Sequence, residues 1–127
     1  MKNKIMIILA ALLLLTAAGC GGVKKEDLAG TWTYAFNESA DGTRTSNDPG
    51  SDRFIFYEDG TAEDIFGTYG TYKLDYKWKI SGSNKIILTA EDGDEFEFGK
   101  YIDGEIVIDM YGLDGKLNGN KQIYVKR

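Results

Sequence analysis

The sequence predicts an all-β fold, an eight-stranded antiparallel up-and-down barrel that is preceded by a signal peptide. Apolar and polar side chains alternate in segments from residue 30 to residue 126, as they do in strands with one buried face. Short turns separate these segments, and several contain Asp-Gly, which is typical of β-hairpins. The third observation is an uncharged apolar run near the amino end.

That apolar run has the three parts of a secretory signal peptide. Lys2 and Lys4 precede it, residues 5–15 are apolar, and small residues follow from position 17 to position 19. A membrane-spanning helix needs roughly 20 apolar residues, so the run is too short to span a bilayer. We therefore predict a signal peptide over residues 1–19.

The only cysteine, Cys20, directly follows the small residues. The tetrapeptide Ala17-Ala18-Gly19-Cys20 resembles the lipobox of bacterial lipoprotein precursors. The resemblance implies that a diacylglycerol, with fatty acids such as palmitate, is attached to the Cys20 sulfur. It also implies cleavage before Cys20 and anchoring at the extracytoplasmic face of the cell membrane. The alternative is an ordinary signal peptide followed by an unrelated cysteine.

After Cys20 we expect a lipidated tether over residues 20–29, with a short helical turn at 24–28, and a barrel domain over residues 30–127. Closing the barrel removes the two free edges that an open sheet of eight strands would have. The alternative, two stacked sheets, normally requires more long connections than this chain has. The predicted strands are 30–37, 53–57, 61–66, 71–80, 85–90, 94–101, 105–110 and 121–126.

Three features resemble small lipocalin-like lipoproteins. They are LAGTW at 28–32, FYEDGTA at 56–62, and one long connection at 37–52 between the first two strands. The resemblance implies a lipocalin-like barrel in which the long connection is a lid.

The same resemblance implies that a basic residue after the last strand, Lys126 or Arg127, packs over Trp32. A cation over an indole ring contributes about 0.5–1 kcal/mol at an exposed site.

Strict alternation predicts many aromatic rings inside the barrel. These rings either form a solid core or surround a narrow apolar pocket under the 37–52 loop. The expected inward residues are Trp32, Tyr34, Phe36, Phe54, Phe56, Tyr72, Tyr76, Trp78, Phe96 and Phe98, with Ile86, Leu88, Ile106, Ile108, Ile123 and Val125. The candidate ligand-binding residues are Tyr34, Phe36, Phe54, Tyr72, Tyr76 and Trp78. We expect Tyr57, Tyr69, Tyr111 and Tyr124 on the outside.

Composition excludes several chemistries. The chain has no histidine, which removes histidine-based catalysis and most zinc sites. Its net charge of −5 disfavours nucleic acid as a partner. Glu58, Asp59, Glu63 and Asp64 are interpreted as solvated turn or outward residues. Acidic and amide side chains in the long loops are interpreted as turn formers rather than calcium ligands. We therefore predict no catalytic residues, no metal, no cofactor and no enzyme activity.

Two functions remain open. The first is a lipid-anchored extracytoplasmic lipocalin-like protein that binds a small apolar or amphipathic ligand. The second is a solid-core envelope protein that binds another protein through its loops. The expected partners are the membrane, through the Cys20 lipid, and either a small lipophilic ligand or an envelope protein. A cavity of roughly 300 Å³ or more beside the long loop would favour the first function.

Overall fold

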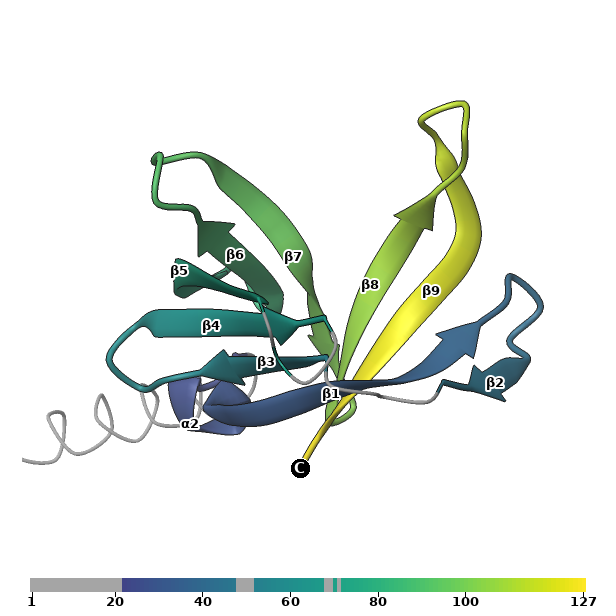
Figure 1. Ribbon diagram of the computed structural model, residues 1–127. Helices are drawn as coiled ribbons and strands as arrows, with labels where there is room; N and C mark the ends of the chain where they lie inside the picture. Colours follow the sequence, from purple (N-terminus) through teal and green to yellow (C-terminus); the bar gives the residue numbers. More distant parts are fainter. Residues whose placement is uncertain (1–21, 48–51, 68–69, 71) are drawn as a thin grey trace, which may run out of the picture.

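The computed structural model describes residues 22–47, 52–67, 70 and 72–127. The predictions for the signal peptide, Cys20 and Tyr69 lie outside these residues. The described chain consists of one helical turn and nine strands (Figure 1): α2 Lys25–Leu28, β1 Gly30–Glu38, β2 Arg44–Ser46, β3 Arg53–Phe56, β4 Thr61–Phe66, β5 Tyr72–Ser81, β6 Lys85–Thr89, β7 Glu95–Ile102, β8 Glu105–Tyr111 and β9 Leu117–Lys126. Within this part of the chain, no helix has the length and apolar character needed to cross a bilayer.

Eight of the strands close into an antiparallel barrel. Each of β3 to β8 pairs with the next strand along the chain, and β1 pairs with both β3 and β9. The predicted eight strands and the closed barrel are therefore confirmed. The segment predicted as one long loop contains the additional strand β2, which forms a hairpin with the end of β1.

The barrel wall is continuous at one end and parts at the other. β1 pairs with β3 only from Gly30 to Thr33, and β7 pairs with β8 only between 100–102 and 105–107. In Figure 1, the end of β7 and the start of β8 lie together near the carboxyl terminus, and the two strands diverge from there. We call the joined end the closed end and the diverging end the open end.

The closed end holds the hydrophobic core. Fully buried side chains from four strands and from α2 meet there: Leu28, Trp32, Phe56, Ile86, Leu88 and Ile106. Burial of each large apolar side chain stabilises the fold by about 1.5–3 kcal/mol. This cluster makes the closed end the rigid part of the barrel.

Helix α2 covers the closed end. Its Leu28 is completely buried, and the Leu28 carbonyl accepts a 2.8 Å hydrogen bond from the Trp32 indole N–H. The Lys126 ammonium donates to the carbonyls of Glu26 and Asp27 at 3.4 and 3.3 Å. In the described residues, the one cation found over an aromatic ring is Arg44, over Phe36. Lys126 is the direct cross-strand partner of Trp32, as the predicted packing of a basic residue on this tryptophan requires, but its ammonium binds the helix carbonyls rather than lying over the indole ring.

A β-bulge in β1 reverses which side chains face inward. Tyr34 lies opposite Tyr124, but the next paired residue is Phe36, which lies opposite Ile123. Because Ala35 has no paired residue on β9, Phe36 faces the outside of the barrel together with Ile123. The inward placement predicted for Phe36, Ile123 and Val125 is therefore wrong, and Tyr124 faces inward rather than outward.

Ile123 is nevertheless fully buried on this outer face. Its cross-strand neighbours are Phe36 on β1 and Val107 on β8, and Arg44 from β2 lies over the Phe36 ring. We call Phe36, Val107 and Ile123 the outer cluster. It gives the barrel a second, smaller apolar contact region beside the main core.

Candidate functional site

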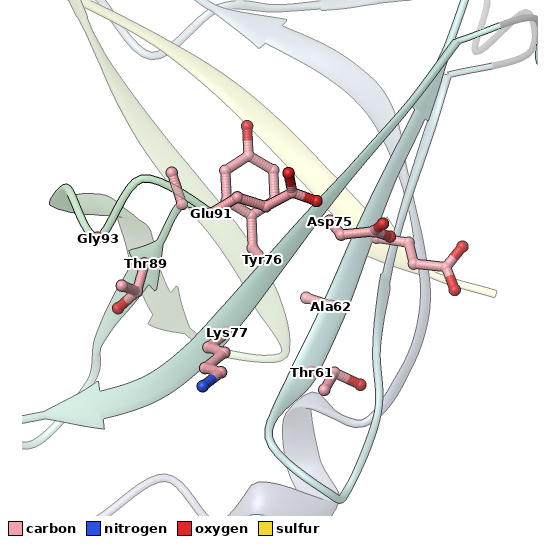
Figure 2. Close-up of a pocket in the computed structure, with 10 residues that line it drawn as sticks. Thr61, Ala62, Asp75, Tyr76, Lys77, Thr89, Glu91 and Gly93 are labelled. Atoms are coloured by element: carbon pink, nitrogen blue, oxygen red, sulfur yellow. The ribbon is translucent and has the colours of Figure 1, made fainter.

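A hollow of about 460 Å³ lies between β4, β5 and the turn after β6 (Figure 2). It exists because β6 ends at Thr89, opposite Lys77, so that the first half of β5 has no neighbour on that side. Its lining residues are Thr61, Ala62, Glu63, Asp75, Tyr76, Lys77, Thr89, Ala90, Glu91 and Gly93.

Ala62 provides part of the space. It lies directly between Phe56 and Tyr76 across the sheet, so a small methyl group stands where its neighbours carry rings. In Figure 2 the Tyr76 ring rises from β5 towards the turn that carries Glu91. A larger side chain at position 62 would occupy this part of the hollow.

Six aromatic rings form a continuous wall along the inner face of the barrel, and one of them, Phe54, also belongs to the hydrophobic core. The rings of Tyr34 and Tyr124 are stacked at 5.5 Å, and Tyr124 contacts Phe98 edge to face at 5.9 Å. Phe98 lies 4.6 Å from Phe54, which stacks on Tyr76 at 6.0 Å.

Phe96 is the last ring of this series and contacts Tyr76 edge to face at 5.9 Å. Tyr76 also lines the hollow. We call the six rings, Tyr34, Phe54, Tyr76, Phe96, Phe98 and Tyr124, the aromatic wall. The wall therefore adjoins the hollow through the Tyr76 ring.

Asp64 places a carboxylate on this inner face. It lies opposite Phe54 on β3 and opposite Leu74 on β5, and antiparallel partners share a face of the sheet. Partial burial, followed by the nearby charge of Asp52, raises the pKa of the Asp64 carboxyl above its ordinary value. The expectation that Asp64 points to solvent is therefore wrong.

The same carboxylate affects two tyrosines of the aromatic wall. Burial raises the pKa of Tyr124 to about 12, and the charges of Asp64 and Asp52 add to this shift. Burial and the charge of Asp64 also raise the pKa of Tyr76. Asp64 is thus close enough to both hydroxyls to act on them electrostatically.

The predicted ligand-binding residues separate into three groups. Tyr34, Phe54 and Tyr76 come together in the aromatic wall. Trp78 lies in the closed-end core, where its indole N–H donates to the Tyr57 carbonyl at 2.8 Å. Phe36 is in the outer cluster, and Tyr72 is 61% exposed and stacks on Phe66 beyond the end of β6. Phe36, Tyr72 and Trp78 therefore do not belong to the aromatic wall.

Two inner-face residues of the site, Asp64 and Tyr124, were predicted to face outward. For Asp64 a signal was present, since Ala62, Asp64 and Phe66 alternate with Glu63 and Ile65 along β4. For Tyr124 no local signal existed, because its orientation follows from the pairing of β9 with β1 and β8.

A smaller hollow lies beside the long connection. It measures about 210 Å³ and is formed by the 37–39 segment and the β8–β9 hairpin. The larger hollow lies elsewhere, so the predicted pocket under the 37–52 connection is not found in the described residues. Residues 48–51 of that connection lie outside them.

Several carboxylates in the turns accept hydrogen bonds from neighbouring residues of the same turn. The Asp59 side chain accepts hydrogen bonds from the Thr61 hydroxyl and backbone N–H, which lower its pKa. Asp41 and Asp114 accept backbone N–H bonds in the same way. Across the described ranges, no group of acidic or cysteine side chains is arranged to hold a metal ion.

A solved structure of a lipocalin-like protein from Bacteroides uniformis is similar to this chain, with a TM-score of 0.51 and 18% sequence identity. The match covers 80% of this chain and 99% of the other. The chain has a lipocalin-like fold. No protein-family model and no curated protein sequence matches the chain. The lipocalin-like barrel is therefore supported by its three-dimensional arrangement rather than by sequence similarity.

Proposed function

We propose that this protein is a lipid-anchored, extracytoplasmic lipocalin-like protein that binds a small amphipathic molecule at the open end of its barrel. The observation that carries this proposal is the 460 Å³ hollow adjoining the aromatic wall. Its volume lies within the range of roughly 300–1,000 Å³ that is usual for small-molecule sites. The ligand's apolar part would lie against the wall, and its polar end would meet the tyrosine hydroxyls and Asp64. In this proposal the protein binds and does not catalyse.

Anchoring would occur through the diacylglycerol on Cys20. The described chain begins at Gly22, and the Val23 N–H donates to the Ser83 carbonyl in the turn between β5 and β6. This turn is at the closed end, so the lipid would hold the closed end towards the membrane. The open end would then face away from it.

Fluorescence titration with a neutral apolar probe, N-phenyl-1-naphthylamine, tests ligand binding. The protein is the predicted mature chain from residue 20, carrying Cys20→Ser so that it is free of lipid; it contains α2 and every strand described above. We expect saturable binding that Ala62→Leu abolishes and that Thr45→Leu, at an exposed position on β2, leaves unchanged. Tyr76→Ala provides a second variant if Ala62→Leu does not fold. No saturable binding by the Cys20→Ser chain would refute the proposal.

Mass spectrometry of the protein from its membrane tests the anchor. We expect a mature chain that starts at Cys20 and carries the mass of a diacylglycerol, and we expect Cys20→Ala to release the protein from the membrane. A soluble chain with an unmodified cysteine would contradict the anchor without affecting the ligand site.

One observation favours the second function, docking on another envelope protein. The β8–β9 hairpin exposes Tyr111, Leu113 and Leu117 at its tip. Site-specific photo-crosslinking from position 113 in intact cells distinguishes the two functions. A single discrete protein adduct would favour docking, and its absence would favour the small-molecule site.

A further inference from the structure

The register of β4 places the Asp64 carboxylate on the inner face, between Phe54 on β3 and Leu74 on β5. Directly opposite strand partners have Cβ atoms about 4.5–5.5 Å apart, and diagonal ones about 7–8 Å. Phe54 is the direct partner of Asp64, and Tyr76 is a diagonal neighbour. Ala62, at the hollow, lies two residues along the same face of the same strand.

The described basic residues leave Asp64 without an ion pair. Lys73, on the neighbouring strand, lies 3.6 Å from Glu63 and 3.8 Å from Asp75, and Lys79 pairs with Glu95 at 3.2 Å. Arg44 pairs with Glu38 and Glu105. Among the described residues, no ion pair or hydrogen bond involves the Asp64 carboxylate, and desolvation makes its charged form unfavourable.

Most charged side chains that line the hollow have the same sign as Asp64. Three carboxylates, Glu63, Asp75 and Glu91, line it together with one lysine, Lys77. Asp52 adds a further negative charge beside Asp64. Electronegative lining raises the local concentration of cations and disfavours anions.

Aromatic rings on several sides complete this environment. Tyr76 and Phe54 come from β5 and β3, and Tyr124 and Tyr34 come from the opposite side of the open end, on β9 and β1. The face of an aromatic ring attracts a cation within about 6 Å of its centre, and the attraction is stronger when the cation is desolvated. A carboxylate and tyrosine faces together are the groups that bind organic ammonium ions.

We propose that the ligand of this site is an amphiphile with a positively charged amine or quaternary ammonium head group, held by Asp64 and the faces of Tyr76 and Tyr124. This inference rests on the proposed function and specifies its ligand class. The alkyl part lies along the aromatic wall, and the head group supplies the positive charge that the Asp64 carboxylate lacks within the described protein.

Three ligands of equal chain length test the charge preference. Isothermal titration compares octyltrimethylammonium, octyl glucoside and octanoate on the Cys20→Ser mature chain. We expect the cation to bind roughly tenfold tighter than the neutral ligand, since an ion pair and cation–π contacts together contribute about 1.4 kcal/mol or more. We expect octanoate to bind weakest.

Two variants assign the preference to Asp64. Asp64→Asn should remove the tenfold preference while octyl glucoside still binds, whereas Asp109→Asn, at an exposed position on β8, should keep it. Asp64→Ser serves the same purpose if Asp64→Asn does not fold. Equal affinities for the three ligands, or a preference that survives Asp64→Asn, would overturn this inference and leave the proposed function standing. Absence of binding by all three ligands would overturn the proposed function itself.

Discussion

Arg44 and Glu105, 61 residues apart in the chain, form a two-pronged ion pair in which Nη1 and Nη2 lie 2.8 Å from the two carboxylate oxygens. The same guanidinium donates from Nε to Glu38 at 3.0 Å and lies over the Phe36 ring. This geometry joins the β1–β2 hairpin to the start of β8 across the outer cluster. It is the long-range contact that gives the long first connection a defined position.

Replacing Arg44 with methionine should loosen the β2 hairpin while leaving the barrel folded. Methionine keeps an apolar cover over Phe36 but removes both ion pairs, which are partly exposed and therefore contribute little to global stability. Hydrogen exchange should become faster for residues 44–46 and stay unchanged in β6. Equal exchange at 44–46 in both proteins would mean that the ion pair does not hold the hairpin.

Acid should release the same hairpin. Hydrogen bonds from Arg44 lower the pKa of Glu105 below its ordinary value of 4.5. A carboxylate with a lowered pKa contributes stability above its unfolded-state pKa and loses it as pH falls through its folded-state pKa. We expect the protection factors of the amides at 44–46 to fall below about pH 4.5. In Glu105→Gln the exchange should already be fast at pH 7 and show no such acid-dependent step.

Trp32→Phe should destabilise the closed end by about 2 kcal/mol, because it leaves a cavity in the core and removes the donor to the Leu28 carbonyl. Trp32 is 1% exposed and makes that bond at 2.8 Å. Urea unfolding followed by circular dichroism measures the change. Tyr111→Phe, at a residue that is 66% exposed, is the matched control and should leave the unfolding midpoint unchanged.

Gly99→Ala should lower the free energy of unfolding by about 1–3 kcal/mol, because a methyl group is forced into a filled space. A Cβ at Gly99 would lie 2.8 Å from the Val107 carbonyl oxygen and 3.0 Å from Ile108. Gly22→Ala provides the control, since nothing lies within 4 Å of the added atom. Equal thermal midpoints for the two variants would show that β8 can shift away from β7 to accommodate the methyl group without loss of stability.

Asp64→Asn should raise the stability of the protein at pH 7 in the absence of ligand. Burial raises the pKa of Asp64, so folding is favoured by its neutral form, and this penalty applies above the ordinary Asp value of 3.8. The stabilisation should shrink as pH falls towards that value. Thermal unfolding at pH 7 and at pH 4 measures both effects. A lower midpoint for Asp64→Asn at pH 7 would indicate that Asp64 has a favourable partner within the protein.

Much of the fold was predictable because its signals are local. The alternation in 71–80 predicted β5, and Asp103-Gly104 predicted the β7–β8 hairpin, in which Asp103 and Gly104 both have positive φ. The site was only partly predictable. Tyr34, Phe54 and Tyr76 were found from alternation, but Phe36 was misplaced because a bulge at Ala35 leaves no mark in the sequence pattern.

By itself, the sequence determined the strands, most of their turns and the closed order of the sheet, because side-chain alternation and turn residues act over a few positions. Only the tertiary structure decided where the wall parts, how β1 changes face, and that Asp64 lies between Phe54 and Leu74. These features depend on pairing between distant strands, where a shift of one residue exchanges the inner and outer faces. The environment of a side chain is therefore set by its neighbours across the sheet, which the local sequence does not specify.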